Sequence, residues 1–517
     1  MHAALPKDAV VAVFGAGAMG IGIAQTASAA GHRVLVFDAR IAAADDARKK
    51  LQATFAALAQ KGALAPAEAT AAAERIRPIH AIGDAVSARL VVEAIVEDAA
   101  AKRELLRQLE VVVAPDAILA SNTSSLSITA LAAGLKHPQR VAGMHFFNPV
   151  PLMPLVEIVS GLATGPDVAA TLYDTALAWG KSPVHAGSTP GFVVNRCARP
   201  YYAEAWRLLA ERAADVPTID AVMREAGGFR MGPFELMDLV GHDVNHAVTQ
   251  GVWEGYFHDP RYTPSVAQRE MVAAGLLGRK SGRGFYDYAP EAVRPAVRTL
   301  PASGAPERVS AYGNLGPAEA LAARLVARGV AVERGPVQDA FPDGVLAAGG
   351  AWLALTDGRT ATGRAATTGA RDLVVFDLAF DYGKAARIAV ARADQCGDEA
   401  FGAAVGLLQA AGLAVSQLDD VAGLAVMRTV AMLVNEAADA ATQGVASAED
   451  IDVAMRKGVS YPAGPFAWGD AIGCARVRDV LRNLHAHYGE ARYRVSPLVA
   501  RRSATGAPLA GQGRGDG

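Results

Sequence analysis

The sequence of 517 residues contains few of the features that mark several special classes of protein. Its only cysteines are Cys197, Cys396 and Cys474, and no two of them stand at the spacing of a CxxC pair. This usage argues against a disulfide framework and against a cysteine-based zinc motif. We therefore expect no metal site and a reducing, cytoplasmic location.

Charge of one sign and long hydrophobic runs are lacking as well. The formal net charge is -2 and no basic stripe is present, so we expect neither nucleic acid nor an anionic membrane as a partner. No apolar run is long enough to cross a bilayer. The first apolar strand begins at Ala9, which leaves no room for a signal peptide, and none is expected.

Short apolar segments do occur, and they alternate with helical patterns in the first third of the chain. This alternation predicts a parallel sheet covered by helices. The Ala-rich stretch 41–77 reads as two helices that are interrupted near Gly62 and Pro66. The expected strands of this sheet are residues 9–14, 33–37, 90–95, 117–120, 141–145 and 155–159.

The pattern changes three times further along the chain. It is mostly helical after Pro190, passes through a Pro-, Ala- and Arg-rich linker, and then becomes α/β again with thinner strands at 309–312, 351–355, 373–376 and 387–391. Helical sequence resumes near Val421, and a Gly-rich tail follows. We predict an α/β Rossmann-type domain with a helical insertion at 1–187, an all-α domain at 188–290, a degenerate α/β segment at 300–420, a second all-α domain at 421–503 and a disordered tail at 504–517.

The two helical regions are related by an internal repeat with an offset of 232 residues. The offset carries Gly232-Pro233-Phe234 onto Gly464-Pro465-Phe466, and Met223-Arg224 onto Met455-Arg456. Such shared motifs at one fixed spacing indicate that a single structural unit occurs twice.

A glycine motif, Gly15-Ala16-Gly17-Ala18-Met19-Gly20, follows the first strand and opens a helix. In this context Gly15 allows the tight turn, Gly17 allows close approach of a pyrophosphate, and Gly20 allows the helix to pack on the sheet. Asp38 ends the second strand, where a carboxylate accepts hydrogen bonds from a ribose 2′-hydroxyl and repels a 2′-phosphate. The motif predicts an NAD site; a turn that binds nothing, or one that binds a flavin, is the alternative.

A second candidate centre pairs a histidine with a glutamate. His145 stands at the carboxyl end of an expected strand, where ligands of such sheets bind. Prolines at 149, 151 and 154 favour an extended return into a short apolar strand that contains Glu157. A carboxylate buried there needs a partner, and His145 would provide one and become a base. On spacing alone, the alternative is that the two side chains have no catalytic role: a histidine that caps a strand and a glutamate on an edge.

Four further motifs stand in a fixed order along the chain. They are Ser121-Asn122-Thr123-Ser124-Ser125-Leu126, His145-Phe146-Phe147-Asn148-Pro149-Val150-Pro151, Leu155-Val156-Glu157 and Thr189-Pro190-Gly191-Phe192-Val193-Val194-Asn195-Arg196. In order and spacing they resemble the 3-hydroxyacyl-CoA dehydrogenase family, over about residues 8–288 and, through the repeat, to about 500. The resemblance implies NAD-dependent oxidation of a (3S)-3-hydroxyacyl-CoA to the 3-oxoacyl-CoA.

The resemblance also implies roles for individual residues. His145 would take the hydroxyl proton, Glu157 would orient the imidazole, and Ser124 and Asn195 would hold the substrate. The family's NAD contacts fall on Glu97, Lys102, Asn122, Asn148 and Lys280, in addition to Gly15, Gly17, Ala18, Met19, Gly20 and Asp38.

The CoA contacts of the family fall in the helical insertion of the first domain. They match Thr54 and Lys61, and the cations at 48–50 lie on the same helix, where an ordinary solvated face is the simpler interpretation. Arg199 follows Asn195 by four residues in a predicted helix and could bind a terminal carboxylate of the acyl group, or could pair with a nearby acid.

The long form, with a degenerate middle and a repeated helical domain, is most similar to the branch of the family that oxidises 3-hydroxyadipyl-CoA in phenylacetate catabolism. The segments 444–452 and 487–490 carry this similarity. A 3-hydroxybutyryl-CoA dehydrogenase is the alternative assignment. A multifunctional β-oxidation protein would need a further hydratase domain, for which the sequence has no room. A non-catalytic NAD-binding protein is a remote alternative, because Ser124, His145, Glu157 and Asn195 are all present.

The repeat predicts a single active site per chain. Asn195 falls on Met427 and Arg199 on Ala431, and no second His-Phe-Phe-Asn-Pro precedes the second copy. We therefore expect the second helical copy to be structural and to pack on the first as an internal pseudo-dimer. A homodimer is the alternative arrangement.

Overall fold

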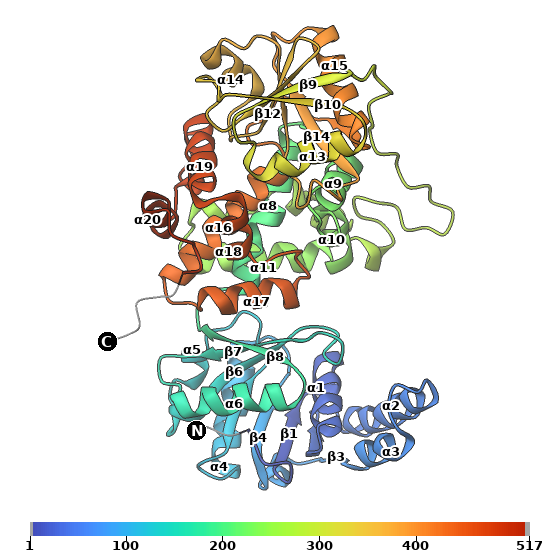
Figure 1. Ribbon diagram of the computed structural model, residues 1–517. Coiled ribbons are helices and arrows are strands. Elements are labelled where there is room, and N and C mark those ends of the chain that lie inside the picture. The colour runs from blue at the N-terminus through green and yellow to red at the C-terminus, as the bar shows by residue number, and fades with distance from the viewer. Residues whose placement is uncertain (1–3, 512–517) are drawn as a thin grey trace. The chain divides into compact units, whose positions relative to one another are not determined.

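The structure is a computed structural model that describes residues 4–511 (Figure 1). The chain forms two compact units. The first contains the residues up to Arg196 together with 443–459, and the second contains 197–442 together with the residues from 460 onward. Within residues 4–511, no helix is long and apolar enough to span a membrane.

The first unit is built on an eight-stranded sheet in the order β3-β2-β1-β4-β5-β6-β7-β8. The strands from β3 to β6 are parallel, β7 returns antiparallel to β6, and β8 is parallel to β7. The six expected strands are confirmed, and β3 and β8 were missed because they lie at the edges of the sheet and contain polar or proline residues. The bounds are β1 Val10–Phe14, β2 Arg33–Phe37, β3 Ile76–Pro78, β4 Ala88–Glu93, β5 Ile118–Ser121, β6 Val141–Phe146, β7 Leu155–Ser160 and β8 Ser182–Gly187.

Helices cover this sheet, whose central strands are buried and rich in valine and alanine. The predicted helix pair after Asp38 is confirmed as a hairpin of two helices (Figure 1), and Pro66 begins the second of them. A proline is well suited to the first turn of a helix because it has no amide to leave unpaired. The main helices are α1 Ala18–Ala29, α2 Ile41–Gln60, α3 Pro66–Glu74, α4 Ala99–Val112, α5 Ile128–Ala132 and α6 Pro166–Ala178.

One helix of the second copy also belongs to the first unit. Helix α17 (Ala448–Gly458) packs against β7 and β8, and the amide of Gly187 donates to the carbonyl of Val445 at 2.7 Å. The predicted segment 421–503 is therefore divided between the two units. The predicted domain boundaries do not include this division, because they treat residues 421–503 as one contiguous domain.

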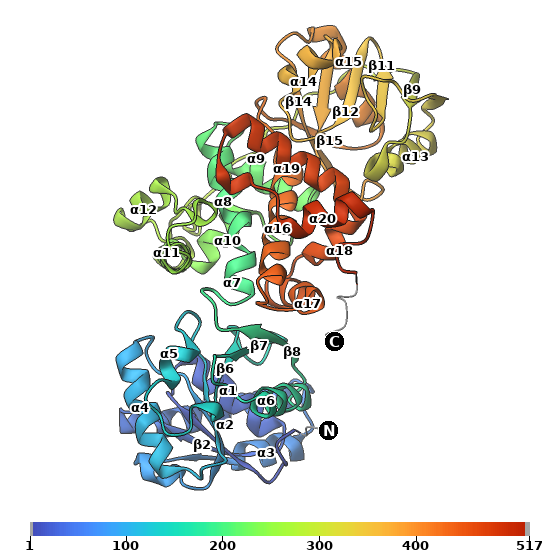
Figure 2. The ribbon, with the colours of Figure 1, turned by 90° about the vertical axis from the view of Figure 1, so that its left-hand side faces the viewer.

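The second unit contains the remaining helices of both copies. Helices α8 and α16 lie side by side (Figure 2), as expected for two copies that pack on each other. The first copy consists of α8 Arg199–Ala210, α9 Val216–Glu225, α10 Pro233–Val240, α11 His242–Gly255 and α12 Val266–Ala273. The second contributes α16 Val426–Thr442, α18 Pro465–Ile472, α19 Cys474–Tyr488 and α20 Pro497–Thr505.

The contact between the copies has an approximate internal symmetry. The Tyr262 hydroxyl donates to Glu436 at 2.6 Å, and the Tyr493 hydroxyl donates to Glu204 at 2.9 Å. Glu204 and Glu436 are related by the 232-residue offset, so each copy offers the same carboxylate to a tyrosine of the other. The repeat is therefore visible in the packing as well as in the sequence.

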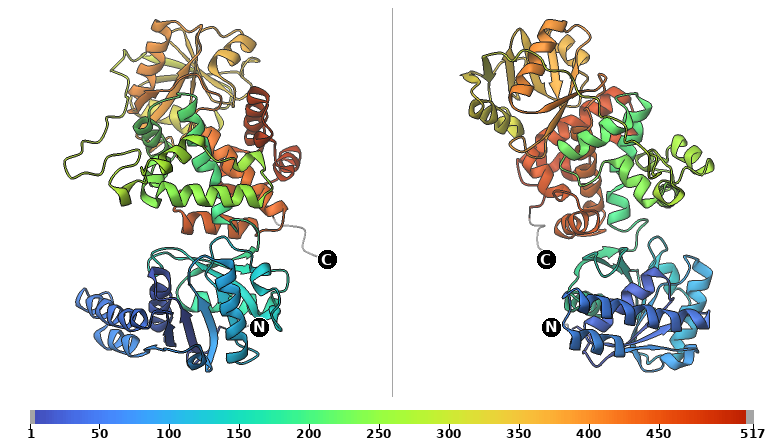
Figure 3. Two further views of the ribbon diagram at one scale, coloured as in Figure 1. Left: turned by 180° about the vertical axis from the view of Figure 1, so that it is seen from behind. Right: turned by 90° about the vertical axis from the view of Figure 1, so that its right-hand side faces the viewer.

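The sheet of this unit has seven strands in the order β10-β9-β11-β12-β13-β14-β15, with helices α13 Glu319–Ala327, α14 Ala361–Thr368 and α15 Asp398–Ala410. Figure 3 shows this region of the chain in yellow and orange from two further sides. The sheet mixes parallel and antiparallel pairs. The four expected strands are confirmed and three short ones were missed. The bounds are β9 Arg308–Tyr312, β10 Ala331–Gly335, β11 Val345–Ala348, β12 Ala351–Leu355, β13 Leu373–Phe376, β14 Arg387–Arg392 and β15 Ala414–Gln417.

The expectation of a disordered tail from residue 504 is wrong for residues 504–511. Leu509 is buried, and the Leu509 amide donates to the Asp470 carboxylate at 2.6 Å. A single apolar side chain and one carboxylate thus fix a Gly-rich segment whose composition suggested disorder. Residues 512–517 lie outside the described residues.

Candidate active site

The glycine-rich turn joins β1 to α1 with the geometry that the motif predicts. Gly15 has a φ of +109°, and a Cβ there would lie 2.4 Å from the carbonyl oxygen of Ala94. At Gly20 a Cβ would lie 1.8 Å from the carbonyl oxygen of Gly15. Gly17 caps α1 before Ala18 and Met19 and faces open space, with no atom within 4 Å of a Cβ built there. The helix N-terminus therefore has room for a pyrophosphate where its amides can donate to it.

The carboxylate of Asp38 lies beside this turn. It accepts hydrogen bonds from the amides of Ala16 and Arg40, each at 2.9 Å. Burial raises the pKa of Asp38, but these hydrogen bonds outweigh it and hold the pKa below its ordinary value. An ionised carboxylate next to the glycine turn fits an adenosine ribose with a free 2′-hydroxyl, as in NAD.

His145 and Glu157 face each other across the antiparallel pair β6 and β7. They are direct partners in the strand register, and His145 Nδ1 lies 2.6 Å from Glu157 Oε2. The second carboxylate oxygen, Oε1, accepts from the amides of Val193 and Val194 at 3.1 and 2.9 Å. Glu157 is fully buried, so every hydrogen bond it accepts comes from the protein. The bland alternative of an unrelated histidine and edge glutamate is excluded by this contact.

Ser124 and Asn195 also come together. The Asn195 side-chain amide lies 3.5 Å from the Ser124 carbonyl oxygen. Glu97 holds the serine loop, because its Oε1 accepts from the Thr123 hydroxyl at 2.6 Å and from the Ser124 amide at 3.0 Å. Three segments far apart in sequence, which contribute Glu97, Ser124 and Asn195, therefore meet near the carboxyl ends of β4 and β5.

A buried ion pair under this loop was missed at the level of sequence. Lys102 Nζ lies 2.8 Å from Glu93 Oε2 and 3.3 Å from Glu97 Oε2, and the lysine is 1% exposed. The Ser121 hydroxyl donates to Glu93 as well. Glu93 closes the apolar run of β4, and the reasoning that a buried carboxylate needs a partner would have found it.

Other predicted cofactor contacts have observed neighbours within the protein. The Asn122 Oδ1 accepts from the amide of Phe146 at 2.9 Å, which ties the end of β5 to the end of β6. Asn148 is exposed immediately after β6. Lys280 belongs to the second unit and pairs with Asp243 at 2.5 Å.

The predicted CoA contacts lie on α2 and at its end. Thr54 donates to the carbonyl of Lys50 one turn earlier, and Lys61 is exposed at the C-cap. Residues 48–50 are exposed too, which agrees with a solvated helix face.

Arg199 belongs to the second unit and is buried. Its guanidinium donates to the Thr249 hydroxyl at 2.9 Å and lies over the Tyr202 ring, with Cζ 4.9 Å from the ring centroid. Burial lowers the pKa of Arg199 from its ordinary value.

Comparison with known proteins assigns the chain to a family. The NAD-binding domain of 3-hydroxyacyl-CoA dehydrogenase matches residues 10–189, and the C-terminal domain of the same enzymes matches both 191–288 and 423–515. The chain belongs to the 3-hydroxyacyl-CoA dehydrogenase family. The double match confirms the helical repeat, and residues 353–421 match the reduced Rossmann-fold domain of 3-hydroxybutyryl-CoA dehydrogenase, which confirms the degenerate α/β segment.

Several relatives of this dehydrogenase are similar over most of their length. The 3-hydroxyadipyl-CoA dehydrogenase of Escherichia coli (strain K12) is 43% identical over 95% of this chain and 97% of its own. A probable 3-hydroxybutyryl-CoA dehydrogenase of Bacillus subtilis (strain 168) is 43% identical over 54% of this chain and 96% of its own. The crystal structure of 3-hydroxybutyryl-CoA dehydrogenase from Escherichia coli K12 superposes with a TM-score of 0.87 at 42% identity, covering 96% of this chain and 98% of that one.

Family membership makes this dehydrogenase an NAD-dependent oxidoreductase that acts on 3-hydroxyacyl-CoA esters. The open cradle at Gly17 and the carboxylate of Asp38 agree with that cofactor. Within residues 4–511, no group of three or more histidine, cysteine or acidic side chains is placed to hold a metal ion.

Proposed function

We propose that this dehydrogenase oxidises (3S)-3-hydroxyadipyl-CoA to 3-oxoadipyl-CoA, with His145 as the catalytic base. The observation that carries the catalytic assignment is the 2.6 Å contact between His145 Nδ1 and the fully buried Glu157. NAD, when bound, supplies the acceptor for the hydride from C3.

The hydrogen bonds of Glu157 determine which nitrogen of His145 is the base. An ionised Glu157 can only accept, so Nδ1 must donate to it and the lone pair stands on Nε2. Nε2 then takes the 3-hydroxyl proton as the C3–H bond breaks. The negative charge of Glu157 stabilises the imidazolium that results, and the amides of Val193 and Val194 hold the carboxylate in place.

Ser124 and Asn195 are proposed to position the substrate. Both present neutral donors next to each other, which suits a hydroxyl that becomes a carbonyl oxygen during the reaction. Glu97 fixes the serine loop from behind, and Lys102 fixes Glu97. We further propose that Glu97 and Lys102 act on the cofactor through this loop, and that Asn122, Asn148 and Lys280 contact NAD.

The dicarboxylic substrate is supported by the name of the long Escherichia coli relative, which matches this chain across both helical copies. Arg199 is the proposed partner of the terminal carboxylate, because a guanidinium forms strong charge-assisted hydrogen bonds with a carboxylate. Thr54 and Lys61 are the proposed CoA contacts. The use of only three cysteines, with no CxxC pair among them, supports the proposal of a reaction in the cytosol.

A comparison of two esters tests the substrate. We expect kcat/KM for 3-hydroxyadipyl-CoA to exceed that for 3-hydroxybutyryl-CoA, and Arg199→Leu to reduce this preference by about 10-fold or more through loss of a charge-assisted hydrogen bond. The ratio of the two values does not depend on the fraction of folded enzyme. Arg482→Leu, at an exposed position, is the matched control and should leave the ratio unchanged.

The same measurement decides between the two candidate substrates. The Escherichia coli crystal structure and the Bacillus subtilis relative are both named for 3-hydroxybutyryl-CoA, so that ester is the second candidate. A higher kcat/KM for the four-carbon ester, or equal losses on both esters in Arg199→Leu, would contradict the dicarboxylic assignment.

A further inference from the structure

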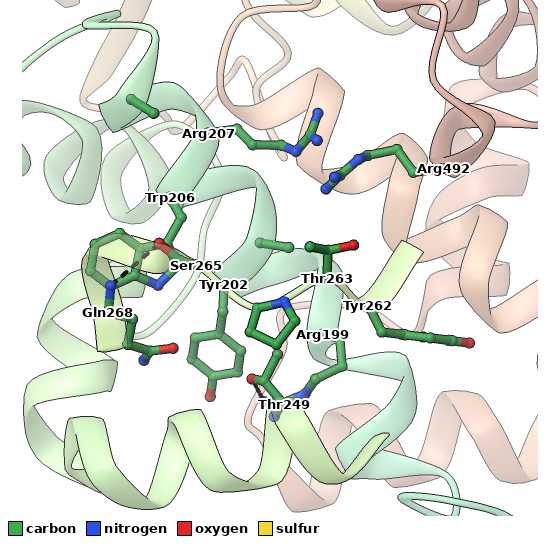
Figure 4. A pocket seen from close by; sticks show the side chains of 13 residues that line it. Arg199, Tyr202, Trp206, Arg207, Thr249, Tyr262, Thr263, Ser265, Gln268 and Arg492 are labelled. Carbon is green, nitrogen blue, oxygen red and sulfur yellow. Dashed lines mark hydrogen bonds between the residues drawn. The ribbon is translucent and has the colours of Figure 1, made fainter. Parts of the chain in front are cut away.

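The second unit contains a pocket of about 190 Å³ whose lining shares one residue, Arg199, with the substrate contacts proposed above. Figure 4 shows it between α8, the segment that leads into α12, and a residue of the second helical copy, Arg492. One water occupies about 30 Å³ of liquid, so the volume corresponds to a small molecule rather than to a single solvent molecule.

The charge of the pocket lining has one sign. Arg199, Arg207 and Arg492 contribute to it, and none of the thirteen lining residues is acidic. Figure 4 shows the guanidinium groups of Arg207 and Arg492 pointing toward each other on one side of the pocket. Two cations held this close favour an anion between or beside them.

Residues of the second copy hold both Arg207 and Arg492 in place, but they accept hydrogen bonds from only some of the N–H donors of the two side chains. Arg207 donates to the Tyr493 hydroxyl at 3.0 Å and to Glu490 at 2.7 Å, and Arg492 Nε donates to the same Glu490 oxygen at 2.7 Å. One carboxylate thus serves two guanidinium groups, each of which has five N–H donors. Arg492 is only 8% exposed.

A buried donor without a partner lies in the same lining. The indole nitrogen of Trp206 is buried and has no hydrogen-bond partner among the described residues. The residue as a whole is only 7% exposed. An indole N–H can only donate, so the missing partner is an acceptor. Leaving such a donor unpaired costs about 1–3 kcal/mol.

The corresponding place on the other copy is built differently. Arg207 falls on Asp439 at the 232-residue offset, and Asp439 pairs with Arg261. Asp259 faces Arg494 there at 3.0 Å. The excess of arginine over acidic residues therefore occurs at the pocket and not at the place related to it by the repeat. If the packing of the helices alone required these arginines, both places would have them.

We infer that this pocket binds a short organic carboxylate. Its carboxylate would meet the guanidinium groups of Arg207 and Arg492, and its carbon chain would pack on Tyr202, Trp206 and Pro264. The apolar part of the lining distinguishes such an acid from inorganic phosphate, which has no apolar body. The inference goes beyond the proposed function, because the two arginines that carry it, Arg207 and Arg492, have no part in the proposed oxidation.

Titration calorimetry of the full-length protein with sodium hexanoate, at ionic strength matched with sodium chloride, tests the inference. We expect binding at one site per chain, at least about 10-fold weaker binding in Arg492→Gln, and unchanged binding in the exposed control Arg482→Gln. Saturating NAD and acetoacetyl-CoA should leave hexanoate binding intact.

Four results would overturn the inference. These are no binding of hexanoate to the wild-type protein, equal binding to Arg492→Gln, and displacement of hexanoate by acetoacetyl-CoA, which would place the acid at the active site. In the fourth, inorganic phosphate binds as tightly as hexanoate, which would contradict the assignment to organic acids. Because a defective active site leaves this binding unaffected, failure of the proposed function can be told apart from failure of the inference.

Discussion

Three carboxylates hold the reactive side chains of this dehydrogenase in place, and two of them, Glu93 and Glu157, are fully buried. Glu157 fixes His145, Glu97 fixes the loop of Ser124, and Glu93 lies beneath both Lys102 and the end of β5. Each carboxylate accepts several hydrogen bonds, so none of them is left with an uncompensated charge. The side chains that would meet the substrate are therefore positioned before it binds.

The role of Glu97 gives a prediction about acid stability. Burial raises the pKa of Glu97, but its hydrogen bonds from Thr123, Ser124 and Ser125 and the charge of Lys102 outweigh it, so the pKa in the folded state is lowered. A lowered pKa means that Glu97 stabilises the fold above the ordinary value near 4.5 and that this contribution is lost as pH falls through the folded value.

Urea unfolding of Glu97→Gln at pH 7 and at about pH 3.5 measures this contribution. The variant should be less stable than the wild type at pH 7, and the difference should shrink at the lower pH. Glu74→Gln, at an exposed position of α3, is the control and should show neither effect. A difference that stays constant or grows on acidification would contradict the assignment.

At the scale of residues, the sequence predicted which candidate side chains come together better than it predicted the residues that hold them in place. The motif order identified His145, Glu157, Ser124 and Asn195, because short motifs carry reacting groups. The pairing of Lys102 with Glu93 was not found, since two charges nine residues apart show no pattern until the strand and helix that carry them are placed.

Helix α17 is the element whose placement was least expected from sequence. It comes from the repeated copy, but it packs on the strand that carries Glu157. A Cβ built at Gly458 would lie 2.5 Å from Leu155 Cδ2 and 3.2 Å from Val194 Cγ2. The Val194 amide is also one of the two amide donors to Glu157. Helix α17 therefore contacts a residue that holds the carboxylate of the proposed His145–Glu157 pair in place.

Substitution of Gly458 by valine should disturb that support. We expect a loss of about 1–3 kcal/mol of unfolding free energy through overpacking, together with a lower kcat. Gly251→Val is the matched control, because Gly251 also lies in a helix and a Cβ added there would have no atom within 4 Å. Unchanged stability and kcat in Gly458→Val would show that α17 does not support the site.

The strands that were missed share a physical reason. Edge strands such as β3 and β10 are partly exposed and contain charged residues, so they lack the continuous apolar pattern of β1 or β4. The order of the helices and the interruption near Pro66 were predicted because capping and proline signals act locally. The ordering of residues 504–511 could not be predicted, since it depends on Asp470 from another helix.

For the whole molecule, the two helical copies stabilise each other through matched contacts. Each copy's carboxylate, Glu204 or Glu436, receives a tyrosine hydroxyl from the other copy. Arg428 is fully buried between Glu204 and Glu211. Removal of one copy would leave buried charges without partners, which costs about 3–5 kcal/mol for a single pair.

Deletion of residues 305–517 tests this dependence. The shortened chain loses α16 from the second unit and α17 from the first, so we expect it to unfold or to associate with another copy in place of the missing half. Size-exclusion chromatography with light scattering and circular dichroism would measure both outcomes, with a chain that ends at residue 511 as control. A monomeric, fully active fragment would contradict the account.

The central claim is that a single His145–Glu157 pair performs the oxidation, and the His145→Gln variant tests it most directly. Glutamine keeps the approximate size of the side chain but cannot act as the base, so kcat should fall by about 10²–10⁴-fold while NAD affinity, measured by calorimetry, stays the same. Turnover within a few-fold of the wild type would contradict the mechanism, and a parallel loss of NAD affinity would assign His145 to cofactor binding instead.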